Sequence, residues 1–253
     1  MDFSQLQTGI ERRPLKIVLT GVEGVGKTTF AADAPAPIFA DLEQGSSTLD
    51  VTRFPDLETW DSLIDAIGFL YTEKHEFKTL VVDSMSVAER LAGQKVAEDN
   101  NVKSVAEIGY GKGQGIVATE FDSFLRGMDS LIKVRNMNII LVCHSVIRRF
   151  DDPAGDSFDQ YAIALAKQLE PKIKQWGDTV LFADHDKTTV EKGEGFNKRR
   201  VAKSFGDRVL YTQHRASHNA KNRFNLPEKL PLKWSAFEQG VNDFYKPANK
   251  EPF

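Results

Sequence analysis

The fold of this chain is decided by one stretch near its beginning, Leu15-Lys16-Ile17-Val18-Leu19-Thr20-Gly21-Val22-Glu23-Gly24-Val25-Gly26-Lys27-Thr28-Thr29. An apolar strand runs directly into the pattern G-x-x-x-x-G-K-[ST], and the residues that follow start a helix. Phosphate-binding loops have this context on both sides. The stretch therefore predicts a nucleoside triphosphate site inside an α/β fold.

The residue types of this loop suit polyphosphate chemistry. Its glycines let the backbone bend so that successive N–H groups point inward, and the following helix presents its positive dipole end. Lys27 is expected to reach the β- and γ-phosphates, and the Thr28 hydroxyl to ligate Mg²⁺. ATP and Mg²⁺ are the expected cofactors. No guanine-reading N-K-x-D motif stands out, although the sequence leaves the choice between adenine and guanine open. The predicted nucleotide-binding residues are Gly21, Val22, Glu23, Gly24, Val25, Gly26, Lys27, Thr28 and Thr29.

Length and composition bound the remaining possibilities. With 253 residues, 41% hydrophobic and 27% charged, the chain suggests one α/β domain with a small appendage. Its net charge of −3 argues against coating of nucleic acid by charge alone. A single cysteine, Cys143, excludes an internal disulfide, and neither a signal peptide nor an apolar stretch near 18 residues is present. We therefore expect a soluble, cytoplasmic protein with no membrane partner.

Apolar strands alternate with helical patterns along the chain, which is typical of a mostly parallel sheet flanked by helices. We expect further strands at 38–41, 79–83, 138–143 and 179–183. Helices are expected at 29–34, 56–71, 84–97, from a glycine-rich break at 109–115 to about 134, and at 162–176, interrupted or restarted near Pro171. Residues 150–158 read as a loop. Antiparallel strands at 188–192 and 199–213 and a helix at 235–245 complete the prediction.

Acidic residues follow two of these strands. Asp83 ends the apolar run at 79–83 and is predicted to be the Walker-B acid that holds Mg²⁺ opposite the phosphate loop. Glu43 lies just past the strand at 38–41, where a carboxylate is well placed to orient and polarise an attacking water. Asp41 is the competing candidate for this base, and a solvated acidic turn is the alternative to both.

His144 follows the strand at 138–143, with Ser145 beside it. Ligands bind at the carboxyl ends of parallel strands, so a polar side chain here is expected to face the γ-phosphate and report its loss. We predict a sensor role for His144, with Ser145 as a helper. A structural histidine is the alternative.

The order of these elements resembles the RecA-type recombinase ATPase core across residues 15–183. Residues 109–113, 144–150 and 220–224 resemble phage-encoded RecA-like ATPases, a group that includes single-strand annealing proteins. Lys221-Asn222-Arg223-Phe224 resembles the K-N-R-F-G motif of the bacterial recombination protein RadA, with Asn225 in place of the last glycine. The expected fold is thus a RecA-like P-loop NTPase core with C-terminal antiparallel strands. It comprises an N-terminal arm (1–14), an ATPase domain (15–226) and a C-terminal helix and tail (227–253).

The resemblance implies roles for these residues. Asp83 would bind Mg²⁺, Glu43 would be the catalytic glutamate and His144 the γ-phosphate sensor. In oligomeric members a cation of one subunit reaches the γ-phosphate of the next, which makes Lys221 and Arg223 candidates for that role. The alternative is a strand-edge basic pair that contacts solvent or DNA.

The family also supplies two DNA-binding loops, which correspond here to 102–115 and 147–160. The first offers Lys103, Tyr110 and Lys112, two cations and a stacking ring among glycines. The second begins with Arg148 and Arg149 but continues with two aspartates. An ordinary linker and a solvated turn are the alternatives. Between 186 and 225, ten basic residues face four acidic ones, which fits either a solvated face or a track for a single strand.

The function that follows is an oligomeric, Mg²⁺-dependent ATPase that binds single-stranded DNA and promotes annealing or recombination, phage-encoded and acting in the host cytoplasm. A single-strand-binding protein is a further expected partner. Two alternatives stay open from the sequence. One is a nucleotide-gated loader or regulator of a replication machine, and the other is a small-molecule P-loop kinase.

Overall fold

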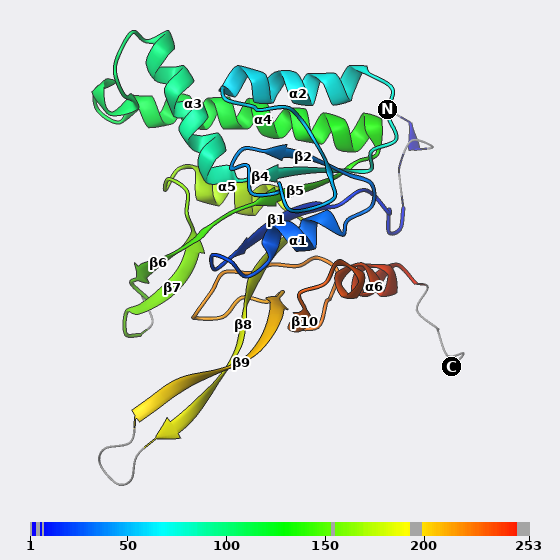
Figure 1. Cartoon of the computed structure of the whole chain (residues 1–253), viewed down its shortest axis with the longest axis vertical. Coiled ribbons are helices and arrows are strands. Elements are labelled where there is room, and N and C mark those ends of the chain that lie inside the picture. The colour runs from blue at the N-terminus through cyan, green and yellow to red at the C-terminus, as the bar shows by residue number, and fades with distance from the viewer. Residues whose placement is uncertain (1, 4–5, 7, 153–154, 193–198, 247–253) are drawn as a thin grey trace.

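The computed structural model describes residues 2–3, 6, 8–152, 155–192 and 199–246, with the side chains of 187–205 left out. Figure 1 shows a layered molecule with a central sheet, helices on both faces and a long β-ribbon that projects from one side. Within the described part, no helix is both long enough and apolar enough to cross a bilayer.

The central sheet has eight strands in the order β10-β9-β8-β1-β5-β4-β2-β3. Its strands β1 (Lys16–Gly21), β2 (Pro37–Asp41), β3 (Thr52–Arg53), β4 (Thr79–Asp83), β5 (Asn138–Val142) and β8 (Thr179–Lys192) are parallel. Strands β9 (Arg199–Tyr211) and β10 (Lys229–Pro231) continue the sheet in antiparallel pairing. The predicted architecture, a mostly parallel sheet flanked by helices with C-terminal antiparallel strands, is confirmed. Strand β5 separates the phosphate-loop strand β1 from the Walker-B strand β4.

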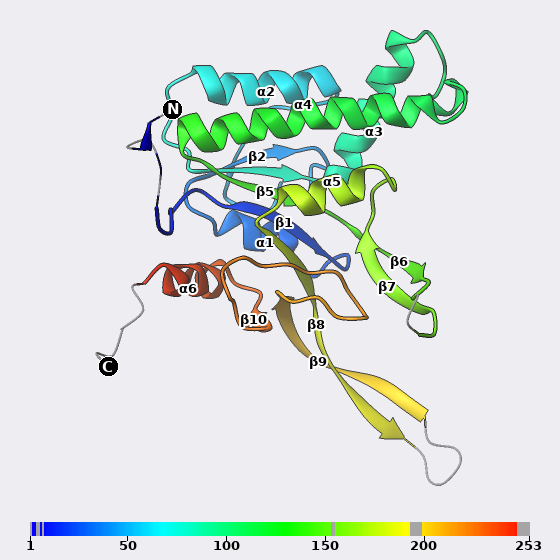
Figure 2. The same ribbon diagram turned by 180° about the vertical axis from the view of Figure 1, so that it is seen from behind.

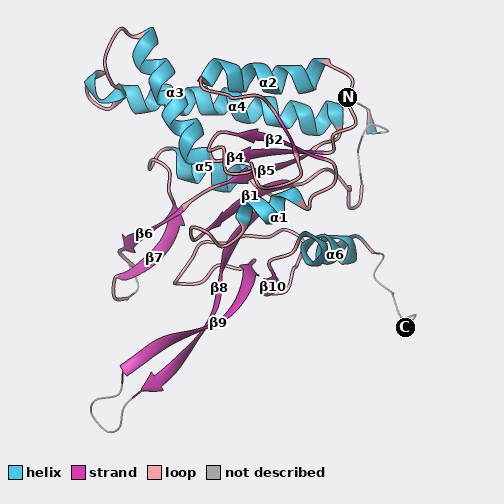
Figure 3. Cartoon of the chain, in the orientation of Figure 1, coloured by secondary structure: helices cyan, strands magenta, loops and turns pink. Residues whose placement is uncertain are grey.

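Helices cover both faces of the sheet (Figures 2 and 3). One face carries α2 (Trp60–Thr72), α3 (Met85–Asp99), α4 (Lys112–Arg135) and α5 (Leu169–Trp176). The other carries α1 (Lys27–Ala32) and α6 (Trp234–Tyr245). Because side chains alternate along a strand, β1 supplies both cores, Val18 to the first and Leu19 to the second.

Aromatic rings fill both cores. In the first, the Trp60 ring of α2 stacks on Phe121 of α4 with centroids 5.3 Å apart. In the second, the ring centroids of Phe30 in α1 and Trp234 in α6 lie 5.7 Å apart. This contact joins the helix after the phosphate loop to the C-terminal helix, so residues 227–245 pack as part of the same hydrophobic layer.

The loop predicted at 150–158 agrees with the structure to one residue at each end. The strands on either side of it, β6 (Ser145–Phe150) and β7 (Phe158–Ile163), form an antiparallel hairpin that was not predicted. The hairpin also takes up most of the predicted DNA-binding loop at 147–160. Val146 lies opposite Ala162 and Ile147 opposite Tyr161, and the centroids of the paired Phe150 and Phe158 rings lie 5.3 Å apart. Cross-strand aromatic pairs of this kind stabilise a two-stranded ribbon.

The helix predicted at 162–176 is wrong in its first half. Ala162 and Ile163 belong to β7, and α5 begins only at Leu169. Pro171 therefore lies in the first turn of α5, where the missing N–H would have had no intrahelical partner. Of the two alternatives, a helix interrupted or restarted near Pro171, the structure therefore supports a helix that starts there.

Other boundaries differ by less. Strand β8 is continuous over the two strands predicted at 179–183 and 188–192, with one irregularity between His185 and Lys187. Helix α4 begins at Lys112, inside the predicted glycine-rich break. Strands β3 and β10 and the 3-10 turn η2 (Val105–Glu107) were not predicted. The predicted tail beyond residue 246 lies outside the described residues.

Gly113 explains why α4 extends into the glycine-rich segment. A Cβ at this position would lie 2.7 Å from Val105 Cγ1 and still closer to the Val105 carbonyl oxygen. Only glycine therefore lets α4 pack directly on η2. Gly115, two residues along the same helix, has open space where its Cβ would be.

Replacing Gly113 with alanine is expected to lower the free energy of unfolding by about 1–3 kcal/mol, because the added methyl group overpacks the contact with η2. The matched variant G115A is expected to raise it by up to about 1 kcal/mol, because alanine favours the helix and meets no neighbour. Urea unfolding of the two variants measures the difference. Equal stabilities would contradict the close packing.

Candidate nucleotide-binding site

The phosphate loop leaves the carboxyl end of β1 where that strand lies closest to β8. Gly21 pairs with Ala183, and a Cβ on Gly21 would collide with the Ala183 carbonyl oxygen. Gly26, directly before α1, has a φ of 102°, which favours glycine because side chains are strained there. Gly21 is therefore needed for the close approach of β1 to β8, and Gly26 for a left-handed backbone conformation before α1.

Lys27 is buried and folds back over its own loop. Its ammonium donates to the carbonyl oxygens of Gly21 at 3.1 Å and Val22 at 3.0 Å. Burial lowers the pKa of Lys27, and the nearby Asp83 carboxylate opposes that shift. The ammonium therefore lies in the loop itself, within reach of any anion that the loop binds.

Thr28 and Asp83 face each other from α1 and β4. The Thr28 hydroxyl donates to Asp83 Oδ2 at 2.7 Å. Burial raises the pKa of Asp83, while the hydrogen bond from Thr28 lowers it. A hydroxyl beside one carboxylate fits Mg²⁺, which prefers oxygen ligands and takes the rest from water and phosphates. No cluster of three or more His, Cys, Asp or Glu side chains suited to a metal occurs among the described residues.

Glu43, Ser84 and His144 meet at the ends of three neighbouring strands, β2, β4 and β5. Glu43 Oε1 lies 2.8 Å from His144 Nε2 and also accepts a hydrogen bond from the Ser84 hydroxyl. The bond to His144 lowers the pKa of Glu43, and the same bond raises the pKa of His144. The Glu43 carboxylate is therefore held, charged, between two donors.

Asp41, the competing candidate for the base, has a different environment. Its oxygens accept from the Gly45 N–H at 3.0 Å, the Ser46 N–H at 2.8 Å and the Ser46 hydroxyl at 2.5 Å. These bonds shape the turn after β2. Of the two carboxylates, Glu43 is the one that lines the cavity beside the phosphate loop.

This cavity has a volume of about 280 Å³ and gathers residues that are far apart in the sequence. It is lined by Glu23, Gly24, Gly26, Lys27, Thr28, Thr29, Glu43, Asp83 and His144, all predicted site residues. Gly45, Thr48 and Leu49 complete the lining and were not predicted. They follow the turn that Asp41 shapes, and no motif in that segment marks them.

Lys221 and Arg223 lie away from this cavity, near the start of β8. The backbone of Lys221 pairs with Val180, and its ammonium donates to the carbonyl oxygens of Lys174, Gln175 and Gly177 at the end of α5. Arg223 lies 3.3 Å from the buried carboxylate of Asp178. The pair therefore does not contact the phosphate loop of its own chain.

The residues predicted to bind DNA divide into two groups. Lys103, Tyr110 and Lys112 are exposed around η2 and the start of α4, and the Tyr110 side chain is fully exposed. On β6, Arg149 is exposed, whereas Arg148 donates to Glu170 at 2.7 Å and to the Leu165 carbonyl at 2.6 Å. Arg148 thus ties the hairpin to α5 and the segment before it.

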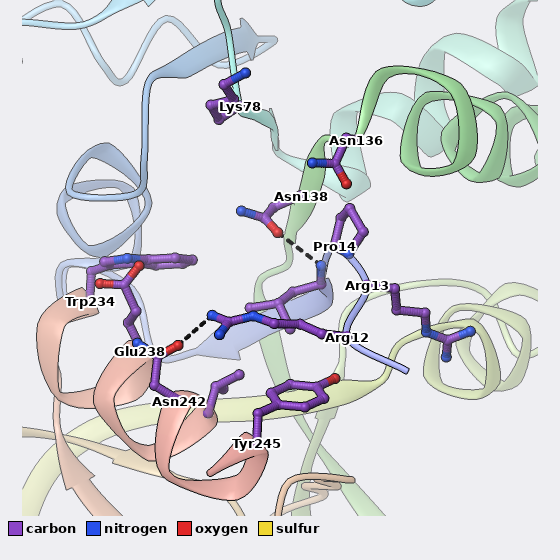
Figure 4. A pocket seen from close by; sticks show the side chains of 12 residues that line it. Arg12, Arg13, Pro14, Lys78, Asn136, Asn138, Trp234, Glu238, Asn242 and Tyr245 are labelled. Atoms are coloured by element: carbon purple, nitrogen blue, oxygen red, sulfur yellow. Dashed lines mark hydrogen bonds between the residues drawn. The ribbon is translucent and has the colours of Figure 1, made fainter. Parts of the chain in front are cut away.

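A second cavity, of about 390 Å³, lies at the opposite edge of the sheet, where β1 and β5 begin (Figure 4). Arg12 bonds to Asn242 of α6 and lies over the Tyr245 ring, and the Leu15 N–H donates to Asn138 at 2.9 Å. The end of the predicted N-terminal arm is thereby tied to α6. This cavity is separate from the phosphate loop.

Comparison with known proteins adds one family. The sequence model of a family described as an AAA domain matches residues 13–224. No curated protein sequence matches the chain. The solved structures that resemble it include a crystal structure of the RadB recombinase, at 18% identity, with 86% of each chain covered and a TM-score of 0.47.

The Glu43–His144 contact predicts a pH-dependent stability. The raised pKa of His144 stabilises the fold below the ordinary pKa of histidine, and this contribution is lost as pH rises. The lowered pKa of Glu43 stabilises it above the ordinary pKa of glutamate, and this is lost as pH falls. The variant H144Q should therefore lose most stability between about pH 4.5 and 6.5, by about 0.5 kcal/mol for a half-exposed pair.

Urea unfolding of wild type and H144Q at pH 5.5 and 8.5 measures this difference. The variant H214Q, at an exposed histidine, is the matched control and should show none. A loss in H144Q that is equal at both pH values would contradict the ion pair.

Proposed function

The chain belongs to the AAA domain family, and from this premise we propose that it is a Mg²⁺-dependent, RecA-like ATPase that binds single-stranded DNA and promotes annealing or recombination. One observation carries the proposal. The phosphate loop, the Thr28–Asp83 pair and the Glu43–His144 pair line one cavity at the carboxyl edge of the sheet. Ligands bind at this edge in open α/β sheets.

Glu43 is proposed to accept a proton from the attacking water. In the structure, Ser84 and His144 hold its carboxylate. We propose that His144 gives up its hydrogen bond to Glu43 and bonds to the terminal phosphate when nucleotide is bound. His144 lines the same cavity as Lys27 and Glu43, which supports this change of partner. This exchange frees the Glu43 carboxylate for general-base catalysis. Lys27, Thr28 and Asp83 would hold the phosphates and Mg²⁺, which neutralises their charge.

The placement of the exposed cations supports DNA binding beside this site. The loop with η2 and the β6–β7 hairpin project from the same side of the molecule in both opposite views (Figures 1 and 2). Tyr110 offers a ring for stacking on a base, and Lys103, Lys112 and Arg149 offer contacts to phosphates. Arg148 contributes to such a surface by fixing the hairpin that carries Arg149. We further propose that the chain is phage-encoded and that a single-strand-binding protein is one of its partners.

Lys221 and Arg223 are proposed to act on the nucleotide of a neighbouring subunit. Their positions near the start of β8 support this, because the phosphate loop of the same chain lies at the other edge of the sheet. A composite site of this kind makes hydrolysis depend on assembly.

Replacing Glu43 with glutamine is expected to lower the ATP hydrolysis rate by about 100- to 10,000-fold, because the amide cannot accept the proton. Affinity for ATP should change little. The matched variant D41N tests the competing base, and it should lose stability through the turn at Gly45 and Ser46 while its folded fraction still hydrolyses ATP. A steady-state phosphate-release assay measures both, and an active E43Q beside an inactive, folded D41N would reverse the assignment.

The ATPase rate is expected to rise with single-stranded DNA and, per subunit, with protein concentration. The DNA loops would gather subunits on one strand, and assembled subunits would bring the trans cations to each other's nucleotides. Phosphate release measured across protein concentrations, with and without an oligonucleotide, tests this. K27A should be inactive throughout. A flat rate that DNA leaves unchanged would contradict the DNA-binding recombinase and favour the nucleotide-gated regulator.

Mixing two inactive variants separates assembly from DNA binding in the same assay. K27A lacks a working phosphate loop, and R223A lacks the trans cation, so a mixed oligomer should regain part of the activity. R13A removes the other arginine on Asp178 and should remain active. Failure of the mixture to regain activity, with both variants folded, would contradict a trans role for Arg223.

A further inference from the structure

The backbone at Arg208 is held beside the phosphate loop. It lies on β9, opposite His185 of β8, and its carbonyl oxygen accepts the Leu232 N–H at 3.0 Å. The next residue, Val209, is buried and pairs with Pro231 of β10. The backbone that carries Arg208 is therefore fixed between two strands.

The Arg208 guanidinium extends from this strand onto the loop. A Cβ built on Gly26 would lie 2.9 Å from Arg208 Nη1, so the guanidinium lies against the backbone of the loop. Among the described residues, no hydrogen bond or ion pair engages this side chain. An exposed arginine pressed onto a glycine, with no carboxylate to hold it, requires another explanation.

Two cations flank the same turn of the loop. Lys27 follows Gly26 directly, and the Arg208 guanidinium lies against Gly26. A phosphate loop offers backbone N–H donors to an anion. An anion bound in the loop would therefore meet the guanidinium as well as these donors.

We propose that Arg208 binds the α- and β-phosphates of the nucleotide in cis, from the same chain that supplies the phosphate loop. The inference rests on the proposed nucleotide site and adds a residue to it. The loop cradles the α- and β-phosphates, and Gly26 is part of that cradle. A guanidinium presents two parallel N–H groups that fit two phosphate oxygens, which a lysine cannot match.

The expected effect is a loss of binding shared by ATP and ADP. R208A should weaken the affinity for both nucleotides by about 10- to 100-fold, since a charge-assisted contact to phosphate is lost. R208K keeps the charge but not the fork and should lie between wild type and R208A. The matched variant K233Q removes an exposed cation from the neighbouring segment and should bind as wild type does.

Isothermal titration of each folded variant with ATP and with ADP tests the proposal, with thermal unfolding in the absence of nucleotide as the check on folding. Affinities of R208A within about threefold of wild type for both nucleotides would overturn it. A loss confined to ATP would also overturn it, because Arg208 would then contact the γ-phosphate. Wild type that binds neither nucleotide would instead contradict the proposed function.

Discussion

The parallel register of β1 with its two neighbours is the constraint on which the rest of the structure depends. Gly21 pairs with Ala183 of β8, while Leu19 pairs with Val142 of β5, and Val142 in turn pairs with Asp83 of β4. This register sets the ends of β1, β4 and β5 close together, while β8 continues past Ala183 to Lys192. A shift of one residue in any of them would reverse its buried faces and carry its terminal side chain away from the phosphate loop.

The position of β5 between β1 and β4 gives the site its chemistry. His144 lies two residues beyond β5, with the phosphate-loop strand β1 on one side and strands β4 and β2, which precede Ser84 and Glu43, on the other. In the proposed mechanism, a single imidazole responds to changes at the phosphates and transmits them to the carboxylate it bonds. The two apolar cores pack against the strands that carry these residues.

The sequence predicts the parts of this fold that local patterns encode. The phosphate loop, the acidic residues after β2 and β4, and His144 each follow an apolar strand, and the structure places them together. The Glu43–His144 contact spans 101 residues and has no local signature. Arg208 belongs to no motif, and only strand pairing brings it to Gly26. The β6–β7 hairpin was missed because its pairing depends on matched residues across an acidic turn and on Arg148 reaching α5.

Two sets of cations lie at different positions along β8, and this has a consequence for assembly. Lys221 and Arg223 lie beside its start, whereas the phosphate loop and Arg208 lie beside Ala183 and His185, farther along the strand. If the first pair serves the next subunit, contact joins the start of β8 in one molecule to the phosphate loop of another. Repeated in one direction, such a contact is heterologous and generates a closed ring or an open filament. The resulting assembly, closed or open, has a direction, as a single DNA strand does.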